Sequence, residues 1–210
     1  MPPYASIDLP PIRQAPPRRV SVAAHATPAT PREAATVSAV DPRFVRAFRA
    51  EFRGVATLLR RLGVRPGDVE DVTQELFLTV HRRWSDYDPA RPVRPWLRAF
   101  AVRAAADYRQ LARVRRERAD DALDPTDESD GADTQLEARE RRRAVMEALD
   151  ALAPERRDVL VLVDLEEAPV PEAAEALGVP LNTAYSRLRE ARKDFAAAVK
   201  RQHLRQGGAP

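Results

Sequence analysis

Cysteine is absent from all 210 residues. The chain therefore has no disulfide, no thiolate zinc site and no cysteine nucleophile, which fits a reducing compartment. No run of about 18 apolar residues occurs, so we expect no membrane insertion. The N-terminus has prolines where a signal peptide needs a continuous apolar segment, so we expect no secretion either. Together these absences favour a cytoplasmic protein.

Histidine and glycine are also scarce, with three and seven residues respectively. His25, His81 and His203 lie far apart in the sequence. No Gly-rich phosphate-binding loop and no paired-carboxylate motif accompanies them. We therefore expect that the protein is not an enzyme and that it holds neither a cofactor nor a metal.

Charge, in contrast, is abundant at 32% of residues, and its two signs nearly balance to a net +3. Its distribution is uneven. The first 40 residues hold eight of the 19 prolines and show no helical periodicity, so residues 1–40 are expected to form a disordered Pro-rich arm. Residues 119–133 contain seven acidic residues and no basic one, which predicts a flexible acidic linker over residues 119–134.

Two blocks of helical periodicity flank this linker. Apolar residues at spacings of three and four predict helices at about 42–62, 68–84, 95–118, 134–152, 155–165, 172–177 and 181–201. No strand-like alternation of useful length occurs. The sequence thus predicts an all-α protein with two small helical domains, at residues 41–118 and 135–205.

The last predicted helix gives the first indication of function. One of its faces is apolar and is expected to pack on the domain; it consists of Leu181, Ala184, Leu188, Ala191, Phe195 and Val199. The other face is polar and basic, and Gly178 permits a sharp turn from the short helix before it. A solvated surface helix could also be basic. The short helix, the Gly turn and the polar start together favour a helix-turn-helix that enters the DNA major groove.

The outward residues of this helix are the candidate DNA contacts. Arg189 and Glu190 would discriminate bases, because arginine bonds guanine and glutamate accepts from cytosine. The other expected contacts, to base edges or to the phosphate backbone, are Asn182, Thr183, Tyr185, Ser186, Arg187, Arg192 and Lys193.

A stripe of four residues marks the helix predicted at 68–84. Asp71, Gln74, Glu75 and Leu78 follow one another at the spacing of a single helix face, opposite the apolar face. Acidic residues alone would suit an ordinary solvated face. An exposed leucine among them favours a protein-binding surface.

The helix predicted at 95–118 carries arginines opposite its apolar face, which is expected to comprise Trp96, Leu97, Phe100, Ala101, Ala104, Tyr108 and Leu111. The arginines are Arg98, Arg109, Arg113 and Arg116, with Arg103 at the edge. Aromatic residues lie nearby at Trp84, Tyr87 and Trp96, although core packing is the better interpretation of both tryptophans. A basic stripe beside aromatic rings is typical of a site for opened, single-stranded DNA.

Two long segments carry a family resemblance. The segment DVEDVTQELFLTVHRRWSDYDP…RPWLRAFAVRAAADYRQ is followed, after a linker, by LDALAPERRDVLVLVDLEEAPVPEAAEALGVPLNTAYSRLREARKDF. Together they resemble a bacterial RNA polymerase sigma factor of the extracytoplasmic-function type, in the sigma-70 family. The resemblance covers roughly residues 44–118 and 135–201. It implies that the first block is region 2, which binds and opens the promoter −10 element, and that the second is region 4, which reads the −35 element.

The resemblance also assigns roles to residues and partners. It implies polymerase contacts at Asp71, Gln74 and Glu75, to which the exposed Leu78 is added. It implies −10 recognition by Trp96, Arg103, Asp107 and Arg109. The implied partners are core RNA polymerase, through its clamp coiled coil and flap, promoter DNA and an anti-sigma factor. The alternative is a polymerase-independent helix-turn-helix regulator, which would normally carry a sensor or dimerisation domain in place of the first block.

Overall fold

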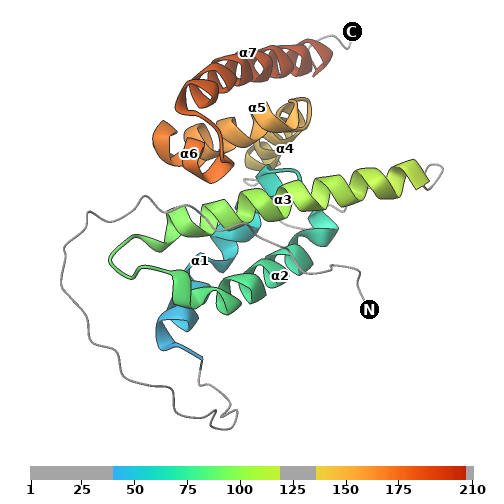
Figure 1. Cartoon of the computed structure of the whole chain (residues 1–210). Helices are drawn as coiled ribbons and strands as arrows, with labels where there is room; N and C mark the ends of the chain where they lie inside the picture. Colours follow the sequence, from blue (N-terminus) through green and yellow to red (C-terminus); the bar gives the residue numbers. More distant parts are fainter. Residues whose placement is uncertain (1–39, 119–135, 207–210) are drawn as a thin grey trace, which may run out of the picture. The chain divides into compact units, whose positions relative to one another are not determined.

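A computed structural model describes residues 40–118 and 136–206 (Figure 1). Every regular element within these residues is helical, which confirms the expected all-α class. Apart from Val40, the arm expected over residues 1–40 lies outside the described residues, and so does the whole of the linker expected over residues 119–134. By their contacts, the helices from Pro42 onward belong to one compact unit.

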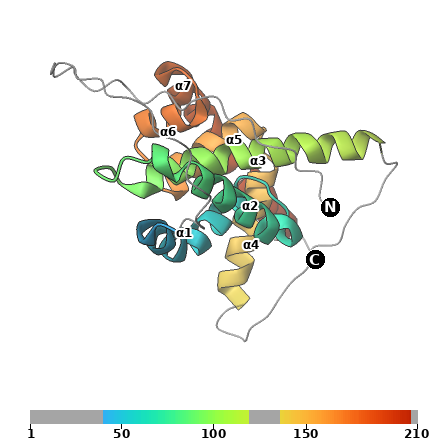
Figure 2. The same cartoon turned by 60° about the horizontal axis from the view of Figure 1, so that its bottom comes forward.

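Three helices, α1 to α3, form the first helical group (Figure 1). Their bounds are Pro42–Arg61 for α1, Val69–Arg82 for α2 and Val93–Arg118 for α3, with the 3-10 turns η1 (Pro66–Asp68) before α2 and η2 (Trp84–Asp86) after it. Each of the three contacts the other two. Figure 2 shows α1 and α2 side by side along α3.

The core of this group follows from the apolar spacing along each helix. Leu59 of α1, Leu62 directly after α1, and Leu76 and Val80 of α2 are fully buried. Phenylalanines at every fourth position of α1 add a row of rings. The ring centroid of Phe48 in this row lies 5.0 Å from that of Phe77 of α2. Burying such side chains contributes about 1.5–3 kcal/mol each, which holds the three helices together.

Four further helices, α4 to α7, form the second helical group. Their bounds are Leu136–Asp150 for α4, Pro154–Leu160 for α5, Val170–Leu177 for α6 and Leu181–Gln206 for α7, with a stretch of π-helix, η4 (Val161–Leu165), directly after α5. Helix α7 contacts all three of the others. The core residues buried between them include Leu149, Val159, Leu162 and Ala184.

Prolines and one glycine place the ends of the short helices. Pro154 stands in the first turn of α5 and Pro171 in the first turn of α6, where a missing N–H costs nothing. Gly178 ends α6 in the left-handed conformation, with φ 66°, and its N–H bonds back into the helix. Because the chain turns sharply there, α7 begins only three residues later, as the helix-turn-helix prediction requires.

The structure corrects two expectations about buried faces. Leu111 is 36% exposed, because no residue of α3 from Arg109 to Arg115 is buried and this part of the helix has little packing partner. Leu181 is 42% exposed, since it is the first residue of α7 and lies at the open end of the turn.

The helix predicted at 155–165 is also two elements rather than one. After Leu160 the backbone widens from α-helix into the π-helical stretch η4, so apolar spacing alone could not reveal the change. Helix α2 ends at Arg82 rather than at Trp84, which belongs to the separate turn η2.

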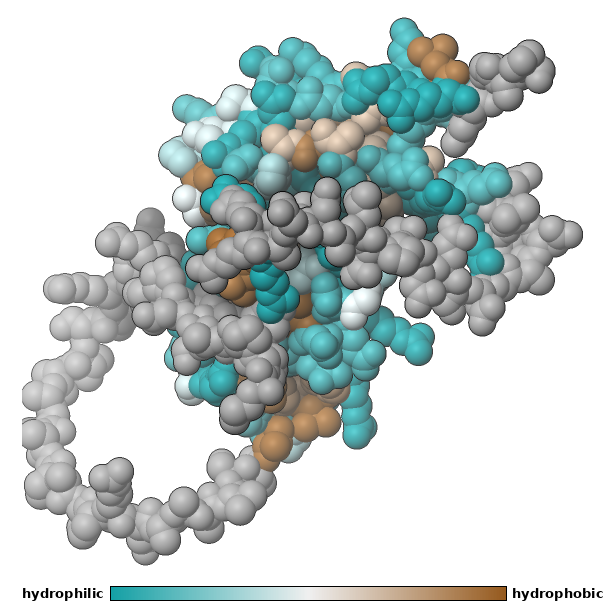
Figure 3. All heavy atoms as spheres, turned by 90° about the vertical axis from the view of Figure 1, so that its right-hand side faces the viewer, coloured by the Kyte–Doolittle hydropathy of each residue, from teal (hydrophilic) through white to brown (hydrophobic). Residues whose placement is uncertain are grey.

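The outer surface is largely hydrophilic on the side shown in Figure 3, where apolar residues form only small, separate areas. The exposed large apolar side chains of the described residues are Val40, Leu78, Leu111, Val145, Leu181, Tyr185 and Leu204. None of the helices that the structure describes is both long and apolar enough to span a bilayer.

Candidate nucleic-acid and polymerase interface

Helix α7 separates its buried and outward residues clearly. Ala184, Leu188 and Ala191 of α7 are buried within the second helical group. The expected DNA contacts Asn182, Tyr185, Ser186, Arg189, Arg192 and Lys193 are exposed, whereas Thr183, Arg187 and Glu190 are half-buried. Tyr185 is 52% exposed. The start of α7 is therefore accessible to a groove of DNA.

Glu190 lies between two basic neighbours on α7. Lys193 Nζ is 3.2 Å from its Oε1, and Arg189 Nε is 3.3 Å from the same oxygen. The hydrogen bond and charge of Lys193, followed by those of Arg189, hold the pKa of Glu190 below its ordinary value. Glu190 is therefore an ionised acceptor at neutral pH.

Arg192 is engaged within its own domain. Its Nε and Nη2 donate to the two carboxylate oxygens of Asp164 at 2.9 and 2.7 Å. A phosphate contact by Arg192, as expected from the sequence, would have to replace or share this bidentate pair. Asp164 lies in η4, so the pair also fixes α7 against that element.

The stripe on α2 is open for most of its length. Asp71, Gln74 and Leu78 are exposed, and Leu78 has 56% of its surface in contact with solvent. Glu75 is half-buried, with Oε1 3.5 Å from Arg82 Nη2. On the other side of the helix, Val72, Thr73, Leu76, Phe77 and Val80 are buried. The stripe therefore makes little contribution to the core.

Trp96 belongs to an aromatic cluster in the first helical group. Its ring centroid lies 4.8 Å from Phe100, 5.3 Å from Tyr87 and 5.9 Å from Trp84. The edge-to-face and tilted arrangements are those of packed rings. The geometry supports core packing as the main role of both tryptophans.

The arginines of α3 do not form the open stripe that the sequence predicts. Arg98 and Arg109 are half-buried and bonded to carboxylates of the second helical group. Arg103 is half-buried and Arg113 is exposed, while the side chain of Arg116 lies outside the described residues. The correction has a physical cause, because helix periodicity places side chains on a face but does not say what covers that face.

Asp107 lies on the exposed side of α3, between the two bonded arginines in sequence. Partial burial raises the pKa of its carboxyl group, and the nearby charge of Arg103 opposes this shift. Asp107 and Arg103 are therefore electrostatic neighbours, as two residues of one recognition surface would be.

Sequence reasoning missed the acidic partners of α3, Asp158 and Glu172. Asp158 stands directly before the apolar run Val159–Val163, and such a placement signals a carboxylate carried into a buried environment. That signal is weak, since the same pattern occurs at the edge of many helices. Glu172 gives no sequence signal at all.

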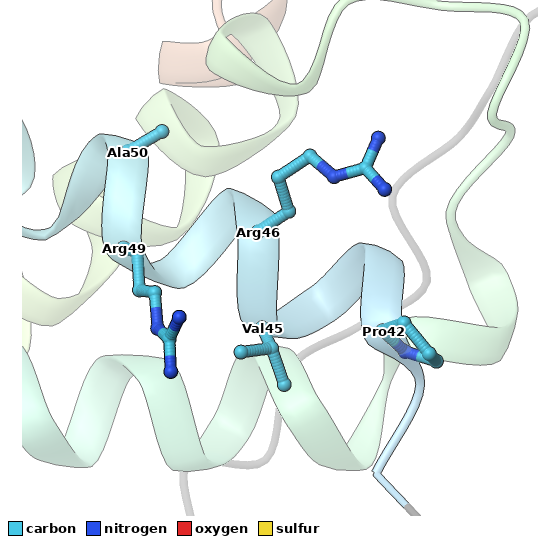
Figure 4. A pocket seen from close by; sticks show the side chains of 5 residues that line it. All are labelled: Pro42, Val45, Arg46, Arg49 and Ala50. Carbon is cyan, nitrogen blue, oxygen red and sulfur yellow. The ribbon is translucent and has the colours of Figure 1, made fainter.

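A surface hollow of about 500 Å³ lies over the start of α1. It is lined by Pro42, Val45, Arg46, Arg49 and Ala50, and Figure 4 shows the two arginine side chains extending in different directions. All five residues come from one helix and their polar groups do not converge, unlike those of a small-molecule site. Among the described residues there is also no group of three side chains that could hold a metal ion.

Two stretches of the chain match known protein families. Residues 47–118 match sigma-70 region 2, and residues 142–195 match sigma-70 region 4. The first stretch falls within α1–α3 and the second within α4–α7, so each helical group corresponds to one region.

Similar curated proteins are sigma factors. RNA polymerase sigma factor NccH of Alcaligenes xylosoxydans xylosoxydans is 28% identical over 153 residues, which cover 70% of this chain and 82% of that protein. The extracytoplasmic-function (ECF) sigma factor SigM of Mycobacterium tuberculosis is 30% identical over 153 residues, covering 73% of this chain and 75% of SigM.

A solved structure of CnrH in complex with the cytosolic domain of CnrY matches with a TM-score of 0.53 and 26% identity, covering 75% of this chain and 87% of CnrH. The fold is also that of RpoE from Bartonella quintana, solved with the anti-sigma factor NepR, at a TM-score of 0.56 and 16% identity over 75% of this chain and 97% of RpoE. With both regions present in order, the chain belongs to the ECF sigma factors of the sigma-70 family, non-enzymatic proteins that bind core RNA polymerase and promoter DNA to initiate transcription.

Proposed function

We propose that region 2 binds and opens the −10 element while holding the polymerase clamp coiled coil, and that region 4 reads the −35 element and contacts the flap. The observation that carries the proposal is the pairing of two exposed surfaces in one chain. One is the α2 stripe of Asp71, Gln74, Glu75 and Leu78, and the other is the outward start of α7. A regulator that acts without polymerase has no use for the first surface.

The −35 contacts in this proposal are the exposed and half-buried residues of α7 from Asn182 to Lys193 described above. Arg189 and Glu190 read bases, and the remaining residues position the helix on the backbone. The −10 contacts are Trp96, Arg98, Arg103, Asp107, Arg109, Arg113 and Arg116. Trp96 would combine this role with core packing, because its ring is packed among other rings.

We further propose that the domains span residues 41–118 and 135–205, with an acidic linker at 119–134 and a Pro-rich arm at 1–40. The acidic composition of the linker supports a tether that does not itself bind DNA. CnrH and RpoE were each solved with a partner protein, which supports an anti-sigma factor for this chain. Function on core polymerase places the protein in the cytoplasm.

The test is reconstitution with core RNA polymerase. Affinity-tagged chain should retain core polymerase from a purified mixture, and the assembled holoenzyme should start transcripts at promoters that core polymerase alone ignores. A chain that binds promoter duplex tightly and specifically by itself, and does not retain core polymerase, would establish the regulator alternative instead.

A further inference from the structure

Two arginines of α3 are bonded to the second helical group. Arg98 Nη1 donates to Glu172 Oε1 of α6 at 2.6 Å, and its Nη2 donates to the carbonyl oxygen of Glu166 at 2.6 Å. Only 16% of the Arg98 side chain remains exposed. Both terminal nitrogens of this guanidinium are therefore already engaged.

Arg109 is held in the same way, further along α3. Its Nη2 and Nη1 donate to the two carboxylate oxygens of Asp158 at 2.7 and 3.0 Å, a parallel pair of charge-assisted bonds. Nη1 also donates to the carbonyl oxygen of Leu62 at the end of α1. The Asp158 side chain is 9% exposed, so solvent does little to weaken this contact.

A third arginine fastens the groups from the opposite direction. Arg157 of α5 donates from Nε to the carbonyl oxygen of Arg61 at 2.5 Å and from Nη2 to that of Arg60 at 3.3 Å. These carbonyls end α1, where the helix dipole favours a cation. Gly63 leaves room for the contact, because a Cβ at this position would lie 3.2 Å from Arg157 Nη1.

The hydrogen bonds that these arginines make between the groups are charged and polar, and interfaces between domains of one chain commonly open when they rest on such contacts. A carboxylate offers arginine the same planar, two-oxygen acceptor that a phosphate offers. A guanidinium that is bidentate to Asp158 cannot make the same pair of bonds to a DNA strand. Region 4 and DNA must therefore compete for these two side chains.

We propose that Asp158 and Glu172 act as internal substitutes for DNA phosphates, holding the free chain closed by occupying Arg109 and Arg98. The second half of this proposal rests on the proposed −10 role of the two arginines. The first half, closure by the acidic residues, does not depend on it. Opening would then expose the −10 surface of region 2 and separate it from region 4 in a single step.

Closure is tested by a distance measurement on the full chain. The absence of native cysteine allows spin labels at Ala50→Cys and Ala197→Cys, two exposed alanines on α1 and α7. Double electron–electron resonance should give one narrow distance distribution for the otherwise wild-type chain and a broad one after Asp158→Asn and Glu172→Gln. A broad distribution in the wild-type chain, or an unchanged one in the variant, would overturn the proposal.

The matched control removes one Asp and one Glu from pairs inside region 4. Asp194→Asn and Glu147→Gln break the pairs with Arg156 and Arg143 and make the same change in net charge. The control should keep the narrow distribution. If Asp158→Asn prevents folding, Glu172→Lys is used alone. Glu172 is part-exposed, and reversing its charge places a cation beside Arg98 and repels it. This variant must also broaden the distance distribution.

Competition is tested with labelled single-stranded DNA of about 15 nucleotides and mixed sequence. The open variant should bind it about tenfold more tightly than the wild-type or control chain, because the apparent affinity of a closed protein is reduced by its open fraction. A broadened distance distribution with unchanged DNA affinity would show that the closure exists but that these arginines do not bind the −10 strand. A narrow distribution with tighter DNA binding would show that the residues do not close the chain.

Discussion

At the scale of single residues, Arg189 and Lys193 of α7 should behave differently although both are basic and exposed. We predict that Arg189→Ala costs about 1–3 kcal/mol at the cognate −35 site and relaxes base preference there, because an arginine on a base edge discriminates bases. The measurement is holoenzyme binding to a panel of −35 variants. Equal losses on every variant would rule out a base-reading role.

Lys193→Ala is the companion of this variant on the same helix. We predict weaker binding to all sequences alike, with the slope of log affinity against log salt reduced by about one, because a phosphate contact releases one counterion. The same panel at several salt concentrations measures both quantities. A sequence-dependent loss would place Lys193 on a base instead.

Tyr108 provides a prediction about pH. Burial, followed by the hydrogen bond that its hydroxyl donates to Asp68 Oδ2 at 2.5 Å, raises the pKa of Tyr108 to about 12. The folded chain thus holds this proton more tightly than the unfolded chain does. The stability contributed by Tyr108 is fully present below about pH 10 and is lost as the pH rises through about 12.

Ultraviolet titration of the phenols measures this effect directly. The wild-type chain should show a late titration step that is lost in Tyr108→Phe. A late step that survives in Tyr108→Phe would show that the shift belongs to another tyrosine.

At the scale of elements, the α2 stripe should serve binding rather than folding. We predict that Asp71→Ala, Gln74→Ala and Glu75→Ala together change the free energy of unfolding by less than about 0.5 kcal/mol, because a surface ion pair such as that of half-buried Glu75 with Arg82 contributes little. Affinity for core polymerase should fall by at least about tenfold. Denaturant unfolding and core-binding titrations provide the two values.

The turn between α6 and α7 depends on Gly178. A Cβ there would meet nothing within 4 Å, so the cost of Gly178→Ala comes from the left-handed backbone alone. We predict a loss of about 1 kcal/mol in the free energy of unfolding, and a smaller loss for Gly178→Asn. Gly67→Ala is the control, since its Cβ also meets nothing and its φ is not positive. Equal effects at both glycines would contradict this account.

How far the sequence predicts these elements depends on the range of the contacts involved. The division of α7 into two faces, the turn at Gly178 and the exposure of Leu78 follow from local spacing, and the structure has all three. The π-helical stretch η4 does not follow, because it leaves the apolar pattern intact. Local pattern thus determines the type and the faces of an element better than its fine geometry.

Contacts between distant residues lie beyond such reasoning. The pairing of Arg109 with Asp158 joins two positions whose separation in sequence carries no periodic signal. Periodicity therefore predicts an open face for Arg98 and Arg109, which the structure covers with carboxylates of the second helical group. The predicted −10 site is sensitive to this limit, because an open face requires that no distant element covers it.

At the scale of the whole molecule, we predict that the chain alone binds promoter duplex weakly and that core polymerase restores binding. If the proposed closed state predominates, with Arg98 and Arg109 engaged by region 4, few chains at any moment present both DNA surfaces. Fluorescence anisotropy on a promoter duplex, with and without core polymerase, should show at least about tenfold tighter binding by the holoenzyme. Tight binding by the free chain would contradict both this prediction and the closed state.

Gly63 has a consequence for how sequences of this kind diverge. It combines a φ of 100° with space shared by Arg157 and Arg109, whose nearest atoms lie 3.2 and 3.4 Å from where a Cβ would stand. A Cβ at this position would press on the guanidinium group of Arg157 and lie against the Cδ of Arg109. In the evolutionary record we therefore expect glycine here, Arg109, Arg157 and Asp158 to be inherited or lost together. A lineage that replaces the glycine should have adopted a different means of keeping its two regions together, or none.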